Sequence, residues 1–319
     1  MEQPPRAPDR PPADSAAALT IVIVTYNTRE LVCQCLESLA EVEAEVFVVD
    51  NVSHDGTAAA ARAARPEAVV VENAENAGFA RANNQALRAA RGRHLCLLNP
   101  DTRVPAGALE ALQQALDQDP RLGIVGPRLI NPDGSFQSAG LSFPTPGSLA
   151  AAAIPWAQPT RGAGQLPAAP GEARPCDWII GACMMIRREV LEQVGLLDEG
   201  YFMYGEEKDL CYRARQAGWQ VACLPGVDVV HYGGQSADQV PEMAYLAFLD
   251  SQLYFLRKFY PARYGRLFAA ATWTGCRLRQ VGGALLGVVR PGRRPVWWGK
   301  SRTAGAGALR CAEYLWRKR

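Results

Sequence analysis

Short runs of β-branched and aliphatic residues alternate with amphipathic segments over the first 120 residues of the chain. Such runs suit strands that are buried on both faces, and we expect four of them, at 20–24, 46–49, 68–71 and 94–98. Apolar residues recur at helical spacing between these runs, and we expect helices at 29–41, from 57, from 78 to about 91, and at 106–118. Gly92 would end the third helix. This alternation predicts an α/β fold with a mainly parallel sheet flanked by helices on both faces.

The pattern is less regular beyond residue 120. The stretch 124–143 suggests irregular strand and turn structure, and the stretch 144–175, rich in Pro, Ala and Gly, suggests a mobile loop over one end of the sheet. After it we expect a core strand, a helix and two short strands, at 176–186, 205–217, 220–224 and 227–231. A long helix from Pro241 has a core stripe at 3-4-3-4 spacing, formed by Leu246, Leu249, Leu253, Leu256 and Tyr260.

The two ends of the chain differ from this body in composition. Residues 1–18 are rich in Pro, Ala and charge and lack an apolar segment, so we interpret them as a disordered leader and not as a signal peptide. From Arg257 onward there are 15 Lys and Arg residues against one acid, Glu313. The rest carries 19 basic and 31 acidic residues, so an acidic body is joined to a basic tail.

The tail contains an apolar stretch, 267–289, that is interrupted by Arg277 and Arg279. A membrane span needs about 20 apolar residues, and each central Arg would cost about 2.5–3.5 kcal/mol, so we do not expect this stretch to cross a membrane. It either lies on an anionic membrane surface or forms a helical cap whose arginines face water. In the first case three tryptophans would lie near the headgroups: Trp297, Trp298 and Trp316.

Several classes of protein are disfavoured by what the sequence lacks. Nine cysteines occur without a C-x-x-C pair, which argues against a zinc ribbon or disulfide framework and indicates a reducing cytosol. The first strand is followed by Thr25-Tyr26-Asn27-Thr28-Arg29, with no glycine-rich loop, so NAD, FAD and P-loop sites are disfavoured. The basic tail carries no nucleic-acid-binding motif, and we expect no nucleic acid partner.

Polar residues follow three of the predicted strands at the point where each strand ends. The clusters are Thr25-Tyr26-Asn27, Asp50-Asn51 and Asn99-Pro100-Asp101. Any one of them alone is typical of a turn. Ligands of open α/β sheets bind just beyond the carboxyl ends of the strands, so three clusters together indicate a binding site. Asp101 is then a candidate for holding a divalent metal against a diphosphate.

The motifs resemble those of the family-2 glycosyltransferases, inverting nucleotide-sugar enzymes with a GT-A fold, and most closely their rhamnosyltransferase-like branch. The resemblance rests on V-I-V-T-Y-N (22–27), V-V-D-N-x-S-x-D-G-T (48–57), N-x-G-F-A-x-A-N-N (76–84), L-L-N-P-D-T (97–102), D-W-x-x-G-A (177–182), F-M-Y-G-E-E-x-D-L-C-x-R (202–213) and a late histidine, His231. It implies a GT-A domain over 19–260, with a nucleotide-binding half (19–120) and an acceptor and catalytic half (121–260). The basic region 261–319 lies outside the resemblance.

Carried over by position, the resemblance implies a set of substrate-binding residues. The set is Thr25, Tyr26, Asn27, Asp50, Asn51, Asn76, Gly78, Asn83, Asn99, Trp178, Gly181 and Asp209. Within it, Asp50 would accept a hydrogen bond from the imide of a pyrimidine base. Gly78 would come close to the ribose and diphosphate because it has no Cβ, although a helix-entry turn explains it equally well. Trp178 would border the sugar or acceptor pocket, or belong to the core.

The family's metal motif often has two acids flanking one residue, but here the first place is Asn99 and only Asp101 supplies charge. Mg²⁺ commonly binds through one or two protein carboxylates together with substrate phosphates, so Mg²⁺ or Mn²⁺ remains the expected cofactor. His231 would complete the metal site, and the alternative is a histidine with local hydrogen bonds at a strand end.

Glu206 and Glu207 match the family's paired catalytic acids, of which the second usually deprotonates the acceptor. Glu207 takes the place of a commoner Asp. An inverting transfer needs one base near the acceptor hydroxyl, opposite the leaving diphosphate. A solvated first helical turn would explain two acids but not their place after F-M-Y-G.

The resemblance therefore implies transfer of a single sugar, such as rhamnose, from a dTDP-, UDP- or GDP-sugar to a glycan or polyprenyl-linked acceptor in cell-surface polysaccharide synthesis. The enzyme would work in the cytoplasm at the inner face of the cell membrane, as a monomer or a homo-oligomer. Two alternatives remain open. A sugar nucleotidyltransferase would need a Gly-rich, Arg-containing loop after the first strand, which is missing. A glycan- or nucleotide-binding protein without turnover is favoured only by Asn99.

Overall fold

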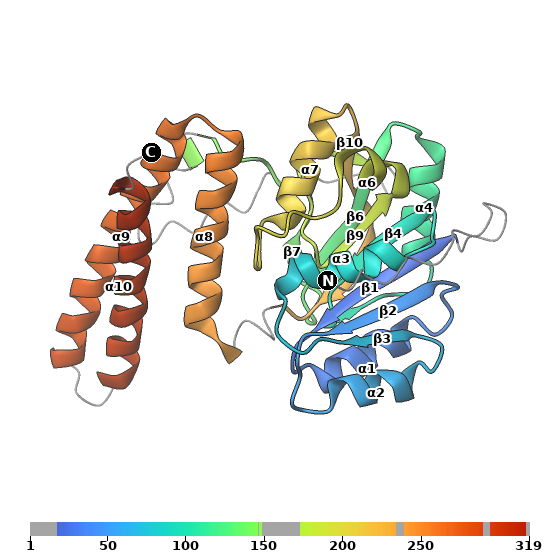
Figure 1. The fold of residues 1–319 in the computed structure, drawn as a ribbon, viewed down its shortest axis with the longest axis horizontal. Coiled ribbons are helices and arrows are strands. Elements are labelled where there is room, and N and C mark those ends of the chain that lie inside the picture. The colour runs from blue at the N-terminus through green and yellow to red at the C-terminus, as the bar shows by residue number, and fades with distance from the viewer. Residues whose placement is uncertain (1–17, 146, 149–172, 234–238, 290–293, 317–319) are drawn as a thin grey trace, which may run out of the picture.

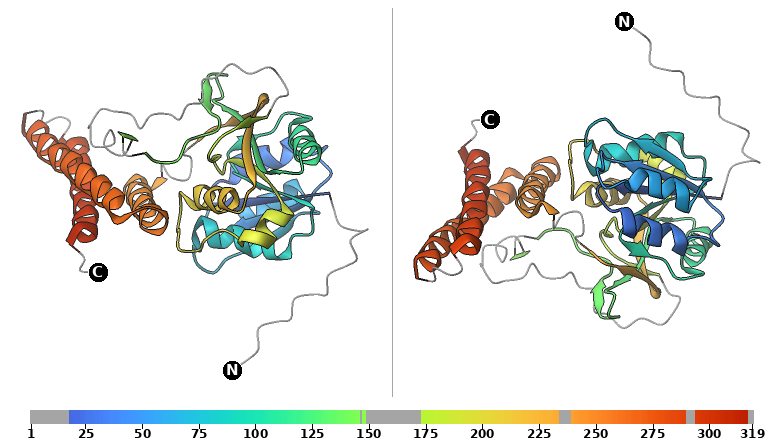
Figure 2. Two further views of the ribbon diagram at one scale, coloured as in Figure 1. Left: turned by 90° about the horizontal axis from the view of Figure 1, so that it is seen from above. Right: turned by 90° about the horizontal axis from the view of Figure 1, so that it is seen from below.

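The computed structural model describes residues 18–145, 147–148, 173–233, 239–289 and 294–316 (Figure 1). The predicted leader, apart from Ala18, lies outside these residues. So does most of the loop predicted over 144–175. The described chain forms an α/β body built on one sheet and a separate group of three long helices beside it (Figures 1 and 2).

The first half of the body alternates strands and helices as the hydrophobic pattern predicts. Its elements are β1 (Leu19–Thr25), α1 (Arg29–Ser38), β2 (Glu45–Asp50), α2 (Thr57–Ala64), β3 (Val69–Glu72), α3 (Gly78–Ala89) and β4 (His94–Leu98). Strands β2 and β4 pair in parallel with β1 on either side, and β3 pairs in parallel with β2. The carboxyl ends of these strands therefore meet at one edge of the sheet.

The second half extends the sheet with both strand directions. Its elements are β5 (Thr102–Arg103), α4 (Ala108–Gln118), β6 (Leu122–Ile130), β7 (Phe136–Ser138), β8 (Arg174–Pro175), β9 (Cys183–Arg187), α6 (Arg188–Val194), α7 (Glu206–Gln216) and β10 (Gln220–His231). The strand order is β3-β2-β1-β4-β9-β6-β10-β5. Strand β9 is antiparallel to both β4 and β6, whereas β6 and β10 are parallel. Helices α1, α2 and α4 pack on one face, and α3, α6 and α7 on the other.

The expectation of irregular structure over 124–143 was wrong in its first part, because β6 is a nine-residue strand in the middle of the sheet. Two glycines and a proline made it look like a turn. A Cβ on Gly123 would lie 2.7 Å from the Val190 side chain, and one on Gly126 would lie 2.4 Å from Ile179. Packing therefore requires both glycines. Pro127 pairs with Leu224 directly before an irregularity in β10, where a missing N–H does not break a ladder.

Three other boundaries differ from the predicted ones. The core strand predicted over 176–186 begins only at Cys183, as β9. The two short strands predicted at 220–224 and 227–231 form one long strand, β10, with a register shift after Leu224. Gly92 does not end α3, which stops at Ala89. A Cβ on Gly92 would lie 2.4 Å from the backbone nitrogen of Thr20, so this glycine allows two backbone segments to approach each other.

The helical unit consists of α8 (Pro241–Phe259), α9 (Ala262–Val289) and α10 (Arg294–Trp316), with α8 between the sheet and the other two helices (Figures 1 and 2). The predicted stripe on α8 is confirmed in its middle. Leu249, Leu253 and Leu256 are buried against Phe268 and Cys311 of the neighbouring helices. Among the described helices, none combines the length and hydropathy needed to cross a membrane.

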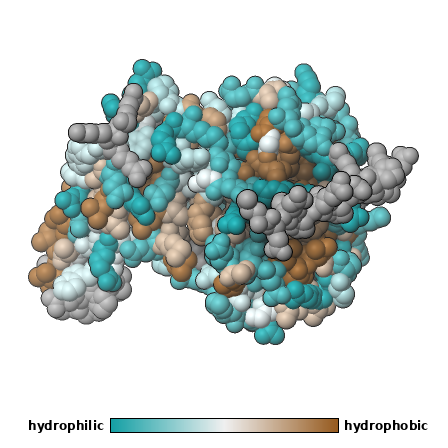
Figure 3. All heavy atoms as spheres, in the orientation of Figure 1, coloured by the Kyte–Doolittle hydropathy of each residue, from teal (hydrophilic) through white to brown (hydrophobic). Residues whose placement is uncertain are grey.

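A row of apolar side chains on α9 is exposed. Leu278, Val281, Leu285 and Val288 are 59%, 59%, 61% and 66% exposed, and their 3-4-3 spacing places them on one face of the helix. Hydrophobic residues line the outer edge of the helical unit, where α9 lies (Figure 3). We call these four side chains the α9 apolar row.

Candidate active site

The carboxyl ends of β1 and β2 are joined by the side chain of Asp50. Its Oδ1 accepts hydrogen bonds from Thr25 Oγ1 at 2.9 Å and from Ser53 Oγ at 2.6 Å, and its Oδ2 accepts one from the Ser53 backbone N–H at 2.9 Å. A carboxylate offers about four acceptor positions, so one remains on Oδ2. Asp50 is 3% exposed, and Tyr26 beside it is half-buried.

Asn27 organises the loop between β2 and α2. Its Oδ1 accepts the His54 backbone N–H at 2.8 Å, and its own N–H donates to Ser53 Oγ at 2.8 Å. The side chains of Asp55 and Thr57 in turn accept the backbone N–H groups of residues 29 and 28. Much of the D-N-x-S-x-D-G-T motif therefore connects two loops of the protein to each other.

The asparagines that follow β2 and β3 shape the entrance to α3. Asn51 donates through Nδ2 to the Gly78 carbonyl at 3.2 Å, and Asn76 Oδ1 accepts the Gly78 N–H at 3.0 Å. Gly78 has φ +75°, and a Cβ there would lie 2.5 Å from the Phe202 carbonyl oxygen. The absence of a Cβ at Gly78 therefore allows close packing against the segment before α7. The resemblance had implied close contact with the ribose and diphosphate.

Asn83 lies in α3 and is 1% exposed. Its Nδ2 donates to the Phe79 carbonyl at 2.9 Å, while its Oδ1 is buried and has no hydrogen-bond partner. A buried amide oxygen without a partner is uncommon in folded proteins.

Asp101 and His231 form the charged centre of the same edge. Asp101 Oδ1 is 3.4 Å from His231 Nε2, and both side chains are about one-tenth exposed, at 8% and 11%. Asn99 Nδ2 is also 3.4 Å from His231 Nε2. β5 brings them together, because Thr102 pairs with His231 across the antiparallel ladder.

Gln137 of β7 fixes the tautomer of His231, and sequence reasoning missed it. Gln137 Nε2 donates to two oxygens, Asn131 Oδ1 and the His231 carbonyl, both at 2.9 Å, which fixes the orientation of the amide. Its Oε1 therefore faces His231 Nδ1 at 2.6 Å and accepts the proton of that nitrogen. In the neutral imidazole the lone pair is then on Nε2, on the side of Asp101.

This arrangement fits a divalent metal. A metal-binding histidine typically donates its second ring N–H to a fixed acceptor, as His231 does to Gln137. Within the described residues no group of three or more His, Cys, Asp and Glu side chains is arranged to hold a metal, so Asp101 and His231 are a candidate pair of protein ligands. Further oxygen ligands would come from a bound diphosphate and water.

Glu206 and Glu207 open α7 and are 4% and 8% exposed. Glu207 Oε2 accepts the Gly205 N–H at 2.9 Å. Burial, and to a smaller extent the charge of Glu207, raises the pKa of Glu206 well above its usual value. Within the described residues, Glu206 Oε2 has no hydrogen-bond partner. The two adjacent acids thus differ, because Glu206 keeps its proton to a higher pH than an ordinary glutamate.

Gly181 lies between the acid pair and the edge that carries Asp101 and His231. A Cβ on Gly181 would lie 3.6 Å from Glu207 Cβ and 3.8 Å from Phe79, so the glycine faces both α7 and the entrance of α3. The next residue, Ala182, accepts the Asn99 backbone N–H at 2.9 Å. Trp178, at the start of this segment, is half-buried and donates to the Ser142 carbonyl at 3.1 Å.

Lys208 is a buried basic residue next to the acid pair, and no sequence motif singled it out. It is 2% exposed, donates to Gln252 Oε1 of α8 at 2.8 Å and lies 4.4 Å from the centre of the Phe255 ring. Burial lowers the pKa of Lys208 to about 8, although Glu207 and Glu206 oppose the shift.

The structure does not bring Asp209 to this edge. The side chain is fully buried, and its carboxylate accepts from Arg213 Nε at 2.5 Å, Lys258 Nζ at 2.6 Å and the Tyr201 hydroxyl at 3.1 Å. Arg213 also donates to the carbonyls of residues 194–196. These contacts anchor the segment before α7, so Asp209 holds the acid pair in place from the interior, and its full burial separates it from the other site residues.

Backbone strain is concentrated around the site. Among the described residues, the non-glycine residues with positive φ are Asn27 (48°), Val52 (66°) and Tyr204 (69°). Asn27 lies two residues after β1, Val52 lies two residues after β2, and Tyr204 lies two residues before α7. A β-branched residue such as Val52 is unfavourable in this conformation, and strain of this kind is often found at functional sites.

Comparison with known proteins gives a family model described as "Glycosyl transferase family 2", which matches residues 20–195. The N-acetylglucosaminyl-diphospho-decaprenol L-rhamnosyltransferase of Mycobacterium tuberculosis is 32% identical over 261 residues, covering 75% of this chain and 83% of that protein. The low-salt glycan biosynthesis hexosyltransferase Agl10 of Haloferax volcanii is 31% identical over 247 residues, covering 75% of this chain and 74% of that protein.

The fold also resembles that of solved structures. The mannosyltransferase PcManGT from Pyrobaculum calidifontis, in complex with GDP-Man and Mn2+, superposes with a TM-score of 0.53 at 20% sequence identity, covering 99% of this chain and 92% of that chain. At this identity the likeness concerns the fold alone, which is the GT-A α/β fold.

Proposed function

The chain belongs to glycosyl transferase family 2 and is a glycosyltransferase, and from this premise we propose that it transfers one sugar with inversion from a nucleoside diphosphate to a polyprenyl-linked or glycan acceptor. One observation carries the proposal. The Asp101–His231 pair and Glu207 lie on either side of one short segment, in which Ala182 bonds to Asn99 and Gly181 adjoins Glu207. A group that binds a diphosphate and a candidate base are thus within reach of one substrate.

Glu207 acts as the general base in the proposed reaction. Its carboxylate takes the proton of the acceptor hydroxyl. The hydroxyl oxygen forms a bond to the anomeric carbon while the bond from that carbon to the diphosphate breaks, and the diphosphate leaves with the electron pair. Attack from the side opposite the leaving group inverts the configuration, and no covalent intermediate forms. The raised pKa of Glu206 favours its neutral form, and a neutral Glu206 would add little negative charge beside the proposed base.

Asp101 and His231 would hold Mg²⁺ or Mn²⁺, and the ion would offset the charge that develops on the leaving diphosphate. Gln137 holds His231 in the tautomer that exposes the Nε2 lone pair. The remaining acceptor position on Asp50 suits the imide N–H of a uracil or thymine base, so we propose a UDP- or dTDP-sugar as the donor.

The acceptor and the location follow from the relatives and from the helical unit. The M. tuberculosis relative is named for a diphospho-decaprenol acceptor. The basic tail and the α9 apolar row suit the surface of an anionic membrane, so we propose that the enzyme acts in cell-surface polysaccharide synthesis at the inner face of the cell membrane.

A thermal-shift panel tests the nucleotide and metal parts of the proposal. UDP, dTDP, GDP and NAD are each added with Mg²⁺, with Mn²⁺ or with EDTA. A ligand at 100 times its Kd stabilises by about 2.7 kcal/mol, so Tm should rise by a few degrees with a pyrimidine diphosphate and metal. Asp101→Ala should abolish the metal-dependent part, and Gln137→Leu should weaken metal binding by about tenfold or more. A shift with NAD alone, or none with any diphosphate, would contradict the proposal.

A further inference from the structure

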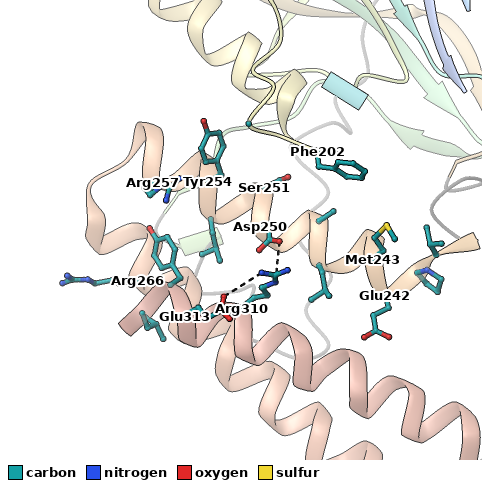
Figure 4. A pocket seen from close by; sticks show the side chains of 18 of the residues that line it. Phe202, Glu242, Met243, Asp250, Ser251, Tyr254, Arg257, Arg266, Arg310 and Glu313 are labelled. Carbon is teal, nitrogen blue, oxygen red and sulfur yellow. Dashed lines mark ion pairs between the residues drawn. The ribbon is translucent and has the colours of Figure 1, made fainter. Parts of the chain in front are cut away.

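A large cavity lies between the segment before α7 and the helical unit. Its volume is about 1230 Å³, above the usual range of small-molecule sites, about 300–1000 Å³. Gly200 and Phe202 form one wall, α8 forms the floor, and α9 and α10 form the other wall (Figure 4). It contains none of the residues that we assign to the nucleotide, the metal or the base.

The cavity is connected to the catalytic edge through Phe202. The Phe202 carbonyl accepts the Phe79 N–H at 2.7 Å, directly beside Gly78, while its side chain is 44% exposed and lines the cavity. On the cavity floor, Ser251 donates to the Met203 carbonyl at 2.8 Å, and α7 begins three residues later with Glu206. A molecule in the cavity can therefore extend past Phe202 toward Glu207.

Apolar side chains predominate at one end of the cavity, where Glu242 also lies (Figure 4). Phe202, Met243, Leu246 and Ala247 line it, and Met243 is 55% exposed. Large exposed apolar side chains in a concave surface favour an apolar ligand because its burial removes them from water. A free sugar or a soluble glycan would not use this wall.

The other end of the cavity is cationic. Arg257 and Arg266 lie there, away from Met243 and Glu242 (Figure 4), and Tyr314 also lines the cavity. Neither arginine makes an ion pair within the described residues, whereas Arg310 is paired with Asp250 at 3.7 Å and Glu313 at 3.9 Å. Burial raises the pKa of Tyr314, and the charges of Arg257 and Arg266 oppose the rise.

At one end the cavity has two arginines without an ion-pair partner among the described residues, and at the other it has apolar side chains. It therefore complements a ligand that is anionic at one end and apolar along the rest. We propose that it binds the diphosphate and the adjoining isoprenoid units of a polyprenyl-diphosphate-linked acceptor, an inference that rests on the proposed function. Arg257 and Arg266 would contact the diphosphate, and the apolar wall would contact the isoprenoid chain. The sugar of the acceptor would then extend past Phe202 toward Glu207.

Binding of farnesyl diphosphate, a short isoprenoid diphosphate, tests the assignment by titration calorimetry. EDTA and the Asp101→Ala variant are used throughout to exclude diphosphate binding at the metal site. The double variant Arg257→Gln/Arg266→Gln should weaken binding at least tenfold, and Ala247→Trp, which fills the apolar end, should weaken it similarly. Arg263→Gln is the matched control, because Arg263 is exposed on α9 but does not line the cavity. It should leave the affinity unchanged.

The outcomes separate this inference from the proposed function. No binding of farnesyl diphosphate by the wild-type protein, or equal affinity in the double variant, overturns the inference while metal-dependent nucleotide binding still stands. Farnesol binding as tightly as farnesyl diphosphate overturns the role of the arginines. If no nucleoside diphosphate binds with metal, the proposed function itself fails. Thermal melting of each variant without ligand checks that it is folded. The arginine variants should melt like the wild type, because the substituted side chains are exposed.

Discussion

At the scale of single residues, the two acids that open α7 are chemically different although they are adjacent. Burial and the neighbouring charge raise the pKa of Glu206 well above its usual value, whereas Glu207 accepts a backbone N–H and adjoins Gly181. The family pattern implies that the second acid is the base, and the different surroundings of the two carboxylates support this proposed assignment.

Substitution of each acid by glutamine should therefore have unequal effects. Glu207→Gln removes the base and should lower kcat by about 100-fold or more, the usual contribution of general base catalysis, with nucleotide binding preserved. Glu206→Gln resembles the protonated side chain and should retain most of the activity. Initial rates with a nucleotide-sugar and a lipid-linked acceptor measure both. Equal losses would contradict the assignment, and full activity of Glu207→Gln would favour a different base.

Another residue-scale feature lies at the opposite end of β4 from the site. The side chain of His94 is fully buried, and neither ring nitrogen has a hydrogen-bond partner. Burial lowers the pKa of His94 below its ordinary value of 6.5, and Asp117 opposes the shift. Below about pH 6.5 the unfolded chain therefore binds more protons at this position than the folded protein does, and stability is lost on acidification.

Replacing His94 should reduce this acid sensitivity. His94→Leu places an apolar side chain of similar size at the position. When the pH is lowered from 7.5 to 5, the Tm of this variant should fall less than that of the wild-type protein. His54→Leu is the matched control because His54 is exposed, and it should keep the wild-type slope. Parallel melting curves for His94→Leu and the wild type across this range would show that His94 does not contribute.

At the scale of elements, helix α7 is held in place by the carboxylate of Asp209. Its partners Arg213, Lys258 and Tyr201 come from three different segments. The sequence motif suggested a substrate contact at this position, but motifs preserve structural anchors as well as ligands, and only burial separates the two. Asp209→Asn leaves two cations less compensated, which should cost about 3 kcal/mol.

Melting and ligand binding together test this role. Tm should fall by several degrees in Asp209→Asn, while the Kd for a nucleoside diphosphate with metal should change less than twofold in the folded protein. Arg62→Gln is the control, because the Arg62–Glu72 pair is about half exposed and should contribute less than about 1 kcal/mol. A large loss of nucleotide affinity without loss of stability would restore Asp209 to the binding site.

The hydrophobic pattern predicted the elements well where each strand is buried on both faces. β1, β2 and β4 are short apolar runs followed by polar residues, and this pattern also located Thr25, Asp50 and Asp101. It failed at β6, whose glycines are required by neighbouring side chains that are distant in the sequence. Gln137 was missed for the same reason. Its role depends on His231, 94 residues away, and no local spacing indicates it.

At the scale of the whole molecule, α8 connects the α/β body with α9 and α10. Its Gln252 accepts a hydrogen bond from Lys208 of α7, and its Lys258 donates to Asp209. Its Ser251 donates to the Met203 carbonyl in the segment before α7. On its other side it packs against α9 and α10. The cavity and the α9 apolar row are therefore held at a fixed position relative to Glu207, as a lipid-linked acceptor would require.

The α9 apolar row should be the part of the molecule that contacts a membrane. Removing residues 261–319 is a poor test, because Leu249, Leu253 and Leu256 would lose the helices against which they pack.

The double variant Leu278→Glu/Leu285→Glu changes only exposed side chains and should keep its Tm. Its binding to vesicles with 30% anionic lipid should fall at least tenfold in a sedimentation assay, since it loses apolar burial and gains two negative charges. Val69→Glu, an equally conspicuous exposed apolar position on β3, should bind like the wild type. Wild-type binding should also weaken as salt is raised, because the tail is basic. Unchanged binding of the double variant would mean that α9 faces water and that α9 and α10 only cap α8.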